Sequence, residues 1–104
     1  GSQRTALMLA ADHSRTEVVQ ELVRAGAALD LQDKDQRTAL ISAARGGHTE
    51  LVQELVRAGA ALDLQDSKGM TALQQAQDRG HAGAAAIIQE AANEAAATPH
   101  NTQG

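Results

Sequence analysis

The sequence predicts an all-α fold: a solenoid of about three helix-turn-helix units that stack side by side, with hairpin loops projecting from the stack. Two observations predict this fold class. The twelve letters LVRAGAALDLQD stand at residues 22–33 and again at 55–66, and a shift of 33 positions aligns 4–36 with 37–69 at 23 identical positions. Threonine and glycine also recur at fixed places in the units. A fixed period of 20–50 residues is typical of stacked repeats.

The period divides the chain into repeats. We assign residues 4–36 to the first repeat, 37–69 to the second and 70–97 to the third. The third becomes rich in alanine, as expected of a terminal cap that has no further neighbour. Residues 1–3 are interpreted as a cloning remnant and part of a leading hairpin, so we expect the chain to be a piece of a longer array. Residues 98–104 are expected to be disordered, because a proline disfavours helix at the residue before it.

Each repeat is expected to open on a short helix. Thr5, Thr38 and Thr71 are placed to cap these helices, because a threonine hydroxyl can accept a hydrogen bond from a backbone N–H of the first turn. Gly47 and Gly80 stand where two of these helices should end, since glycine adopts the left-handed conformation that stops a helix.

The second helix of each unit is predicted to be amphipathic. Thr16 and Thr49 are its candidate caps, each followed by a glutamate in the first turn, and Gly26 and Gly59 are expected to end it. The apolar stripe of the first unit consists of Val18, Val19, Leu22 and Val23. The letters AALDLQD that follow are extended and turn-rich, so we expect them to project as hairpins.

This pattern resembles the ankyrin repeat over residues 4–97. The resemblance rests on Thr-Ala-Leu at 5–7, 38–40 and 71–73, on Gly-His at 47–48 and 80–81, on VVQELVRAGAALDLQD and on the Asp-x-x-Gly of 66–69. It implies the stacked architecture described above.

The chain departs from the family pattern at several positions. Where the family has Thr-Pro-Leu-His, the proline is replaced by alanine, and Met8, Ile41 or Gln74 stands at the histidine position. Gln36 and Ser14 replace glycines. If those two positions keep a positive φ, each replacement costs roughly 1 kcal/mol.

Composition excludes several classes of protein. The 104 residues suit one small domain, and the absence of cysteine excludes disulfides and thiolate metal sites. A net charge of −4 and the absence of aromatic residues argue against nucleic-acid binding, which needs a basic surface or stacking platforms. No apolar run approaches the roughly 20 residues that cross a bilayer. We therefore expect an intracellular, cytoplasmic protein, with the nucleus left open, and no membrane contact.

The resemblance implies a protein–protein interaction module, part of a larger array, that binds a protein or peptide through its hairpin tips and the concave face of its first helices. Positions at which the two copies differ cluster there, which favours a binding face, although drift wherever stacking does not hold the sequence would give the same variation. The alternative is a structural spacer or C-terminal capping segment without partner contact. We predict partner contacts at Arg4, Met8, Asp12, His13, Lys34, Asp35, Arg37, Ile41, Arg45, Ser67, Lys68, Met70, Asp78 and Arg79.

Charge predicts the character of the partner. The outer sides of the second helices sum to a negative charge, whereas the hairpin tips sum to a positive one, from Arg4, Lys34, Asp35, Arg37 and Lys68. An acidic peptide would be steered to the tips, and an ordinary solvated surface is the alternative reading. We expect a monomer, with end-to-end self-association open through an uncapped N-terminal face at Leu9, Val18 and Val19.

No enzyme, cofactor or metal site is predicted. His48 and His81 occupy equivalent places in successive repeats, for which the resemblance implies a structural role, and His13 is a lone surface residue. The motifs His-Glu-x-x-His, Gly-x-x-x-x-Gly-Lys and Gly-x-Ser-x-Gly are absent from the sequence. The acidic pairs of the second helices lie one turn apart on a solvated face, not across a cleft. Without aromatic residues the core buries little area per residue, so we expect marginal stability.

Overall fold

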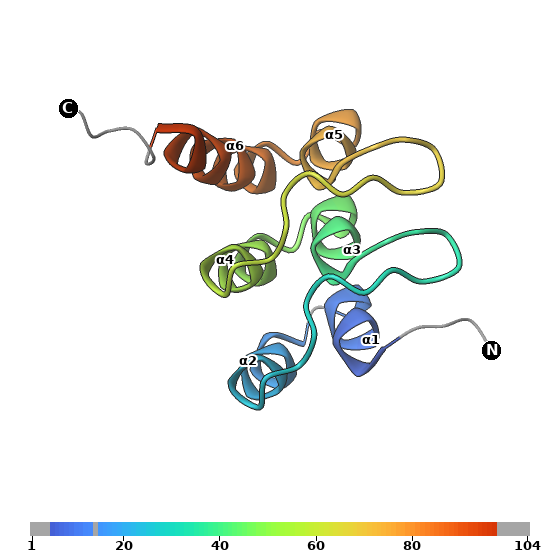
Figure 1. Cartoon of the computed structure of the whole chain (residues 1–104). Coiled ribbons are helices and arrows are strands. Elements are labelled where there is room, and N and C mark those ends of the chain that lie inside the picture. The colour runs from blue at the N-terminus through green and yellow to red at the C-terminus, as the bar shows by residue number, and fades with distance from the viewer. Residues whose placement is uncertain (1–4, 14, 98–104) are drawn as a thin grey trace.

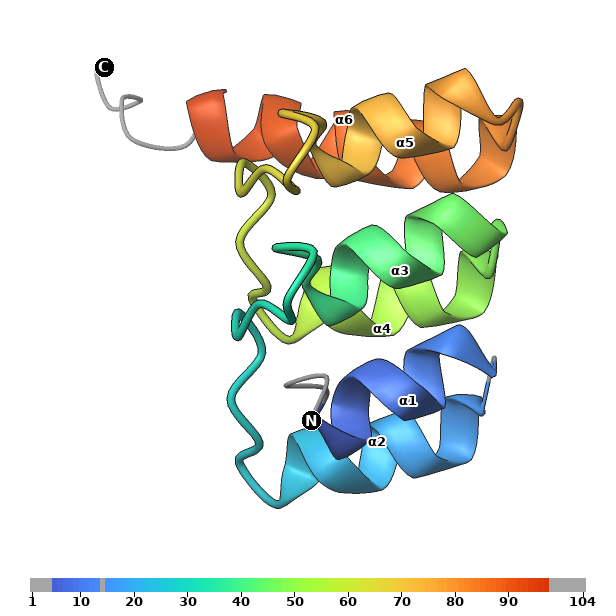
Figure 2. The same cartoon turned by 90° about the vertical axis from the view of Figure 1, so that its right-hand side faces the viewer.

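The computed structural model describes residues 5–13 and 15–97. Within them the chain forms six helices and no strand: α1 (Ala6–Asp12), α2 (Thr16–Arg24), α3 (Ala39–Gly46), α4 (Thr49–Arg57), α5 (Ala72–Asp78) and α6 (Ala82–Ala97). The helices α1, α3 and α5 form one layer and α2, α4 and α6 a second layer beside it (Figure 1). The view turned by 90° shows the three pairs stacked one upon another (Figure 2). The predicted all-α solenoid is confirmed.

The first helix of each pair begins as predicted. The hydroxyl oxygens of Thr5, Thr38 and Thr71 each accept a hydrogen bond from the backbone N–H three residues later. At Thr71 the cap is reciprocal, because the side chain of Gln74 accepts a hydrogen bond from the Thr71 N–H at 2.9 Å. This capping box satisfies two helix-end groups of α5.

The second helices begin differently from the prediction. The caps of α2 and α4 are Arg15 and His48, neither of which makes a side-chain cap bond, so the assignment of Thr16 and Thr49 as caps is wrong. Each threonine is the first helical residue instead. The Thr49 hydroxyl donates to the Gly47 carbonyl at 3.4 Å, pointing back toward the turn, so it does not cover an N–H of its own helix.

The helix ends follow the glycines. Gly47 has φ 73° at the end of α3, and Gly80 has φ 77° after α5. Gly26 and Gly59, after α2 and α4, have φ 85° and 94°, and the next residue in each case donates its N–H to the carbonyl of the third-last helical residue. These bonds close the helices in the manner predicted. Ser14, at the corresponding turn of the first pair, lies outside the described residues, as do residues 1–4 and 98–104.

The core lies between the two layers and between successive pairs, and alanine and branched aliphatic side chains fill it. The central pair is covered on both sides. Leu51, Val52 and Leu55 of α4 are fully buried, whereas Val19 is the only fully buried residue of α2, a helix of nearly the same sequence. The difference arises because α4 packs between α2 and α6, while α2 has a helix of its own layer on one side alone.

The loops at 27–38 and 60–71 project beside the first-helix layer (Figure 1). Each is tightened by one aspartate at its base. Asp33 Oδ1 accepts hydrogen bonds from the N–H groups of Asp35 and Arg37, at 2.8 and 3.0 Å, and Asp66 Oδ1 does the same for the residues 33 positions later. We call α1, α3 and α5 together with these two loops the loop face.

The two loops are also bonded to each other. The side-chain amide of Gln32 donates to the carbonyl of Gln36 in its own loop at 2.9 Å and to the carbonyl of Gln65 in the next loop at 3.0 Å. The Ser67 N–H donates to the Asp35 carbonyl at 2.9 Å. These bonds hold the two loops at a fixed spacing.

Candidate functional site

A small hollow of about 120 Å³ opens on the loop face between the two loops, and most of the predicted contact residues line it. Eight of them meet there: Asp35, Arg37, Arg45, Ser67, Lys68, Met70, Asp78 and Arg79. Asp66 and Gln75 complete the lining and were absent from the predicted set. The sequence held a signal for Gln75, because the position differs in all three repeats, as Leu9, Ser42 and Gln75.

Two predicted contact residues are misplaced. Met8 and Ile41 are each 1% exposed and lie in the core, so they present no surface to a partner. They occupy the same position of α1 and α3, three residues after the capping threonine. The exchange of one large apolar side chain for another conserves core volume and is a packing change, not surface variation.

The other predicted residues lie away from the hollow or outside the description. Asp12 and His13 are exposed at the far end of α1, and Lys34 is exposed on the first loop. Arg4 falls outside the described residues. The predicted set is therefore divided between the eight residues of the hollow, two core residues, three scattered surface positions and Arg4, which is not described.

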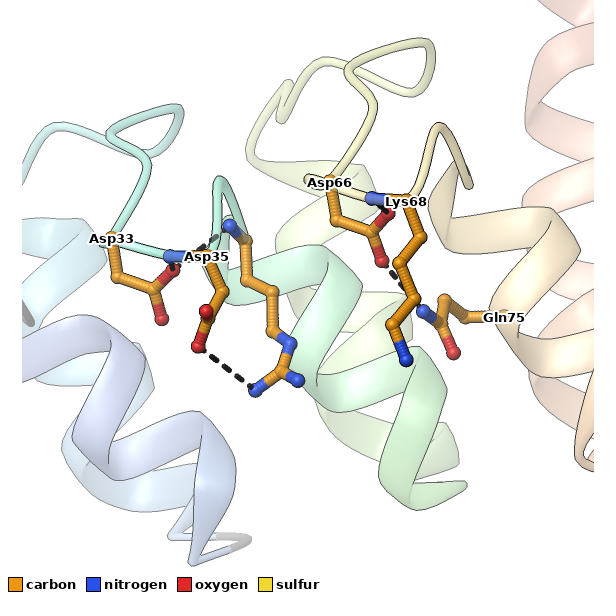
Figure 3. A network of polar contacts seen from close by, with 6 residues as sticks. Asp33, Asp35, Asp66, Lys68 and Gln75 are labelled. Carbon is orange, nitrogen blue, oxygen red and sulfur yellow. Dashed lines mark hydrogen bonds and ion pairs between the residues drawn. The ribbon is translucent and has the colours of Figure 1, made fainter.

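Asp66 is the polar centre of the hollow's base. Its Oδ1 accepts from the N–H groups of Lys68 and Met70 at 2.8 and 3.0 Å, and its Oδ2 accepts from Gln75 Nε2 at 2.7 Å. Figure 3 shows Asp33 in the corresponding position of the preceding loop, and Gln75 reaching Asp66 from α5. The residue at the Gln75 position of the second pair is Ser42.

These bonds govern the titration of Asp66. Burial raises the pKa of its carboxyl, but the hydrogen bonds from Met70, Gln75 and Lys68 favour the carboxylate and together outweigh burial. The nearby Arg37 acts in the same direction. The pKa of Asp66 therefore lies below its usual value, and the group stays charged.

The walls of the hollow carry cations. Arg45 stands in the last turn of α3, and its pKa is lowered by burial and by the like charges of Arg37 and Arg79. Asp66 and Asp35 oppose this shift without cancelling it. Among the described residues, Arg37 Nη1 lies 4.0 Å from Asp35 Oδ2, while Arg45 and Lys68 form no ion pair.

A comparison with protein families decides the identity of the fold. A family model described as ankyrin repeats, in three copies, matches residues 7–98. The chain belongs to the ankyrin-repeat family. Ankyrin repeats generally serve as protein–protein interaction modules and are typically not enzymes. The comparison with curated proteins gave no match.

A histidine joins two of the ankyrin repeats. The Nε2 atom of His81 lies 3.2 Å from the carbonyl oxygen of Arg45, within hydrogen-bond distance. Its ring also covers Gly47, where an added Cβ would stand 2.6 Å from Nδ1. His48 packs in a similar way against Gly46 of its own repeat. These contacts support the structural role that the family resemblance implied.

Other kinds of site find no support in the described part of the ankyrin array. No three His, Asp or Glu side chains there come together in a way that could hold a metal ion. None of its helices combines the length and the apolar character needed to traverse a bilayer. The outer ion pair of Arg24 with Glu21, at 2.9 Å, is exposed and contributes little to stability, and that of Arg57 with Glu54, at 3.8 Å, joins an exposed arginine to a half-buried glutamate.

Proposed function

We propose that this chain binds another protein by its loop face and that the segment it binds is an acidic peptide. The observation that carries the proposal is the gathering of eight predicted contact residues around one hollow of the loop face. Those residues come from three repeats and from both loops and helices. Drift by itself gives no reason for these residues to meet in one hollow.

Charge supports an acidic partner. The hollow holds four cations, Arg37, Arg45, Lys68 and Arg79, against three carboxylates. One of these carboxylates, on Asp66, is already occupied by three hydrogen bonds inside the protein. The chain as a whole has a net charge of −4, but the charges that line the hollow sum to a positive value. The hollow therefore attracts anionic segments of a partner.

Selection from a random peptide library displayed on phage tests this proposal, because the library makes no assumption about the sequence of the partner. The wild-type chain is expected to enrich peptides rich in Asp and Glu. A variant with Arg37→Glu and Lys68→Glu should lose them, because both residues line the hollow. The matched control carries Arg24→Glu and Arg57→Glu, which makes the same change of net charge on the outer helices.

The outcomes separate the alternatives. Peptides that bind wild type and the outer control but not the hollow variant support the proposal. Peptides lost equally from both variants would show that net charge alone drives binding, and the loop face would have no special role.

A second candidate function is that of a stacking segment in a longer array. It is favoured by the N-terminal face, where Leu9 and Val18 are 46% and 44% exposed although the equivalent Ser42 and Leu51 are buried. Apolar side chains at these two positions fit burial under a preceding repeat. If no peptide is enriched on any of the three proteins, this spacer function becomes the better account.

A further inference from the structure

We infer that the hollow between the two loops is a pocket for a single oxyanion, a carboxylate or a phosphate, with Arg45 as its central contact. The inference rests on the proposed function, since the oxyanion would be carried by the bound peptide. It goes further by naming the chemical group and the residue that receives it.

The first argument is the shared neighbourhood of the cations. Arg37 precedes α3, Arg45 stands in its last turn, and Arg79 follows α5, so three guanidinium groups reach one hollow of about 120 Å³ from two repeats. Burial, and after it the repulsion from the other two guanidinium groups, lowers the pKa of Arg45. An anion placed between the three cations would relieve this repulsion and accept charge-assisted hydrogen bonds.

The second argument is that, within the described residues, the protein's own carboxylates form no hydrogen bond with these three guanidinium groups, although Arg37 and Asp35 form a long ion pair. Both oxygens of Asp66 bond within the loop and to Gln75, and neither bonds to an arginine. The Asp35 carboxylate stands 4.0 Å from Arg37, beyond a good hydrogen bond. Asp78 is exposed at the end of α5 and forms no ion pair among the described residues. The Arg45 side chain forms no hydrogen bond with the described residues, so its five N–H donors can serve a ligand.

The third argument is that the pocket is not an automatic product of the repeat. One repeat earlier, the position of Arg45 is held by Asp12 and that of Arg79 by Gly46. The corresponding place beside the first loop thus has an acid where the hollow has its central cation. The pocket is a feature of the junction between the second and third repeats alone.

Titration with inorganic phosphate and, separately, with acetate tests the inference. Amide and guanidinium ¹H–¹⁵N shifts are followed at pH 7, with sodium chloride adjusted to keep ionic strength constant. The largest shifts are expected at Arg45, Lys68 and Arg79. Arg45→Gln should weaken the apparent affinity by about tenfold or more, because charged hydrogen bonds are lost. Arg57→Gln, the same change in the last turn of α4, should leave it unchanged.

The two anions distinguish the source of the group. Saturable binding of phosphate but not acetate indicates a phosphorylated side chain, and the converse indicates Asp or Glu. Shifts spread evenly over the loop face, or equal in wild type and Arg45→Gln, would overturn the inference. Should Arg45→Gln lose its dispersed spectrum, the exposed Arg79→Gln provides the same comparison.

Failure of the pocket and failure of the proposed function give different results. If library peptides bind in a way that Arg37→Glu with Lys68→Glu abolishes and Arg45→Gln does not affect, the loop face binds peptides and the pocket is wrong. If phosphate or acetate binds at Arg45 and no peptide is enriched, the pocket stands and the peptide-binding function fails.

Discussion

Gln36 and Gly69 occupy the same place in successive loops and have nearly the same backbone, with φ 64° and 78°. A side chain in this left-handed region crowds the following carbonyl. Gln36 is the only non-glycine residue with positive φ among the described residues. The hydrogen bonds it makes run through its backbone N–H and carbonyl, which glycine also has.

Replacing this residue should stabilise the fold. We expect Gln36→Gly to raise the free energy of unfolding by about 0.5–1 kcal/mol, less than the full steric relief because glycine also frees the unfolded chain. Urea denaturation measures the change. Gly69→Gln is the mirror experiment and should lower stability by about 1 kcal/mol, since nothing lies within 4 Å of its missing Cβ and the cost is purely conformational. A destabilising Gln36→Gly would contradict this account.

The bond between Gln75 and Asp66 predicts a pH-dependent mutation. Gln75→Ser copies the residue of the second repeat and removes the 2.7 Å bond to Oδ2, at a cost of about 2 kcal/mol at pH 7. Because the pKa of Asp66 is lowered by folding, the stability it contributes is complete above its unfolded pKa of about 3.9 and is lost as pH falls through the folded value. The cost of Gln75→Ser should therefore shrink at pH 3.

Denaturant titrations of both proteins at pH 7 and pH 3 check this expectation. Ser42→Ala in the second repeat is a control, since Ser42 makes no side-chain bond to Asp33 in the structure. A cost of Gln75→Ser that is the same at both pH values would mean that the charge of Asp66 is not involved.

At the scale of the helix, α2 and α4 make a natural comparison. Their sequences, TEVVQELVR and TELVQELVR, differ at one position, yet Leu55 is fully buried and its counterpart Leu22 is only half-buried. Local sequence cannot account for this difference. It depends on how many neighbours a helix has in the stack.

The same mutation should therefore have two different effects. Leu55→Ala is expected to cost about 3 kcal/mol, for lost burial and a cavity that the packed surroundings cannot close. Leu22→Ala should cost about 1 kcal/mol, because much of its side chain is already hydrated. Chemical denaturation of the two variants measures both losses in the free energy of unfolding. Equal losses would show that the outer repeat is as tightly packed as the central one.

Elements were the part of the fold that sequence could predict. Periodicity located all six helices of the described chain, because the threonine caps of the first helices and the glycine stops act locally and recur every 33 residues, although the caps predicted for the second helices were wrong. Burial was harder to predict than the helices were. Met8 and Ile41 were predicted to lie on the surface because the two residues differ between repeats. A core position can also exchange one large apolar residue for another. The bond from Gln75 to Asp66 joins two residues whose side chains meet only after the loop has folded back.

At the scale of the whole molecule, stability depends on a few interfaces between pairs. Eighteen apolar residues are buried in the described part of the chain, and half of them are alanine. Each alanine removes less apolar surface from water than a leucine or an aromatic residue would. Repeat arrays lose stability when interfaces are few, because each pair depends on its neighbours.

We therefore expect a thermal midpoint below about 75 °C. Hydrogen exchange should show the order of opening, with α2 exchanging before α4 because of its poorer burial. Circular dichroism on heating measures the midpoint. Reversible melting above about 75 °C would show that alanine packing in this array is stronger than its area suggests.

The bonds between the loops also determine how the molecule could be lengthened. Two side chains of the first loop bond to the second loop. Asp30 accepts a hydrogen bond from the N–H of Ala61, and Gln32 donates one to the carbonyl of Gln65. Their counterparts, Asp63 and Gln65, are the same residue types. If a duplicate of segment 37–69 were inserted after Gly69, Asp63 and Gln65 could thus make the same two hydrogen bonds to the loop of the duplicate. The 33-residue segment can therefore stack against a copy of itself, and arrays of increasing length could be made by repeating it without any change of sequence.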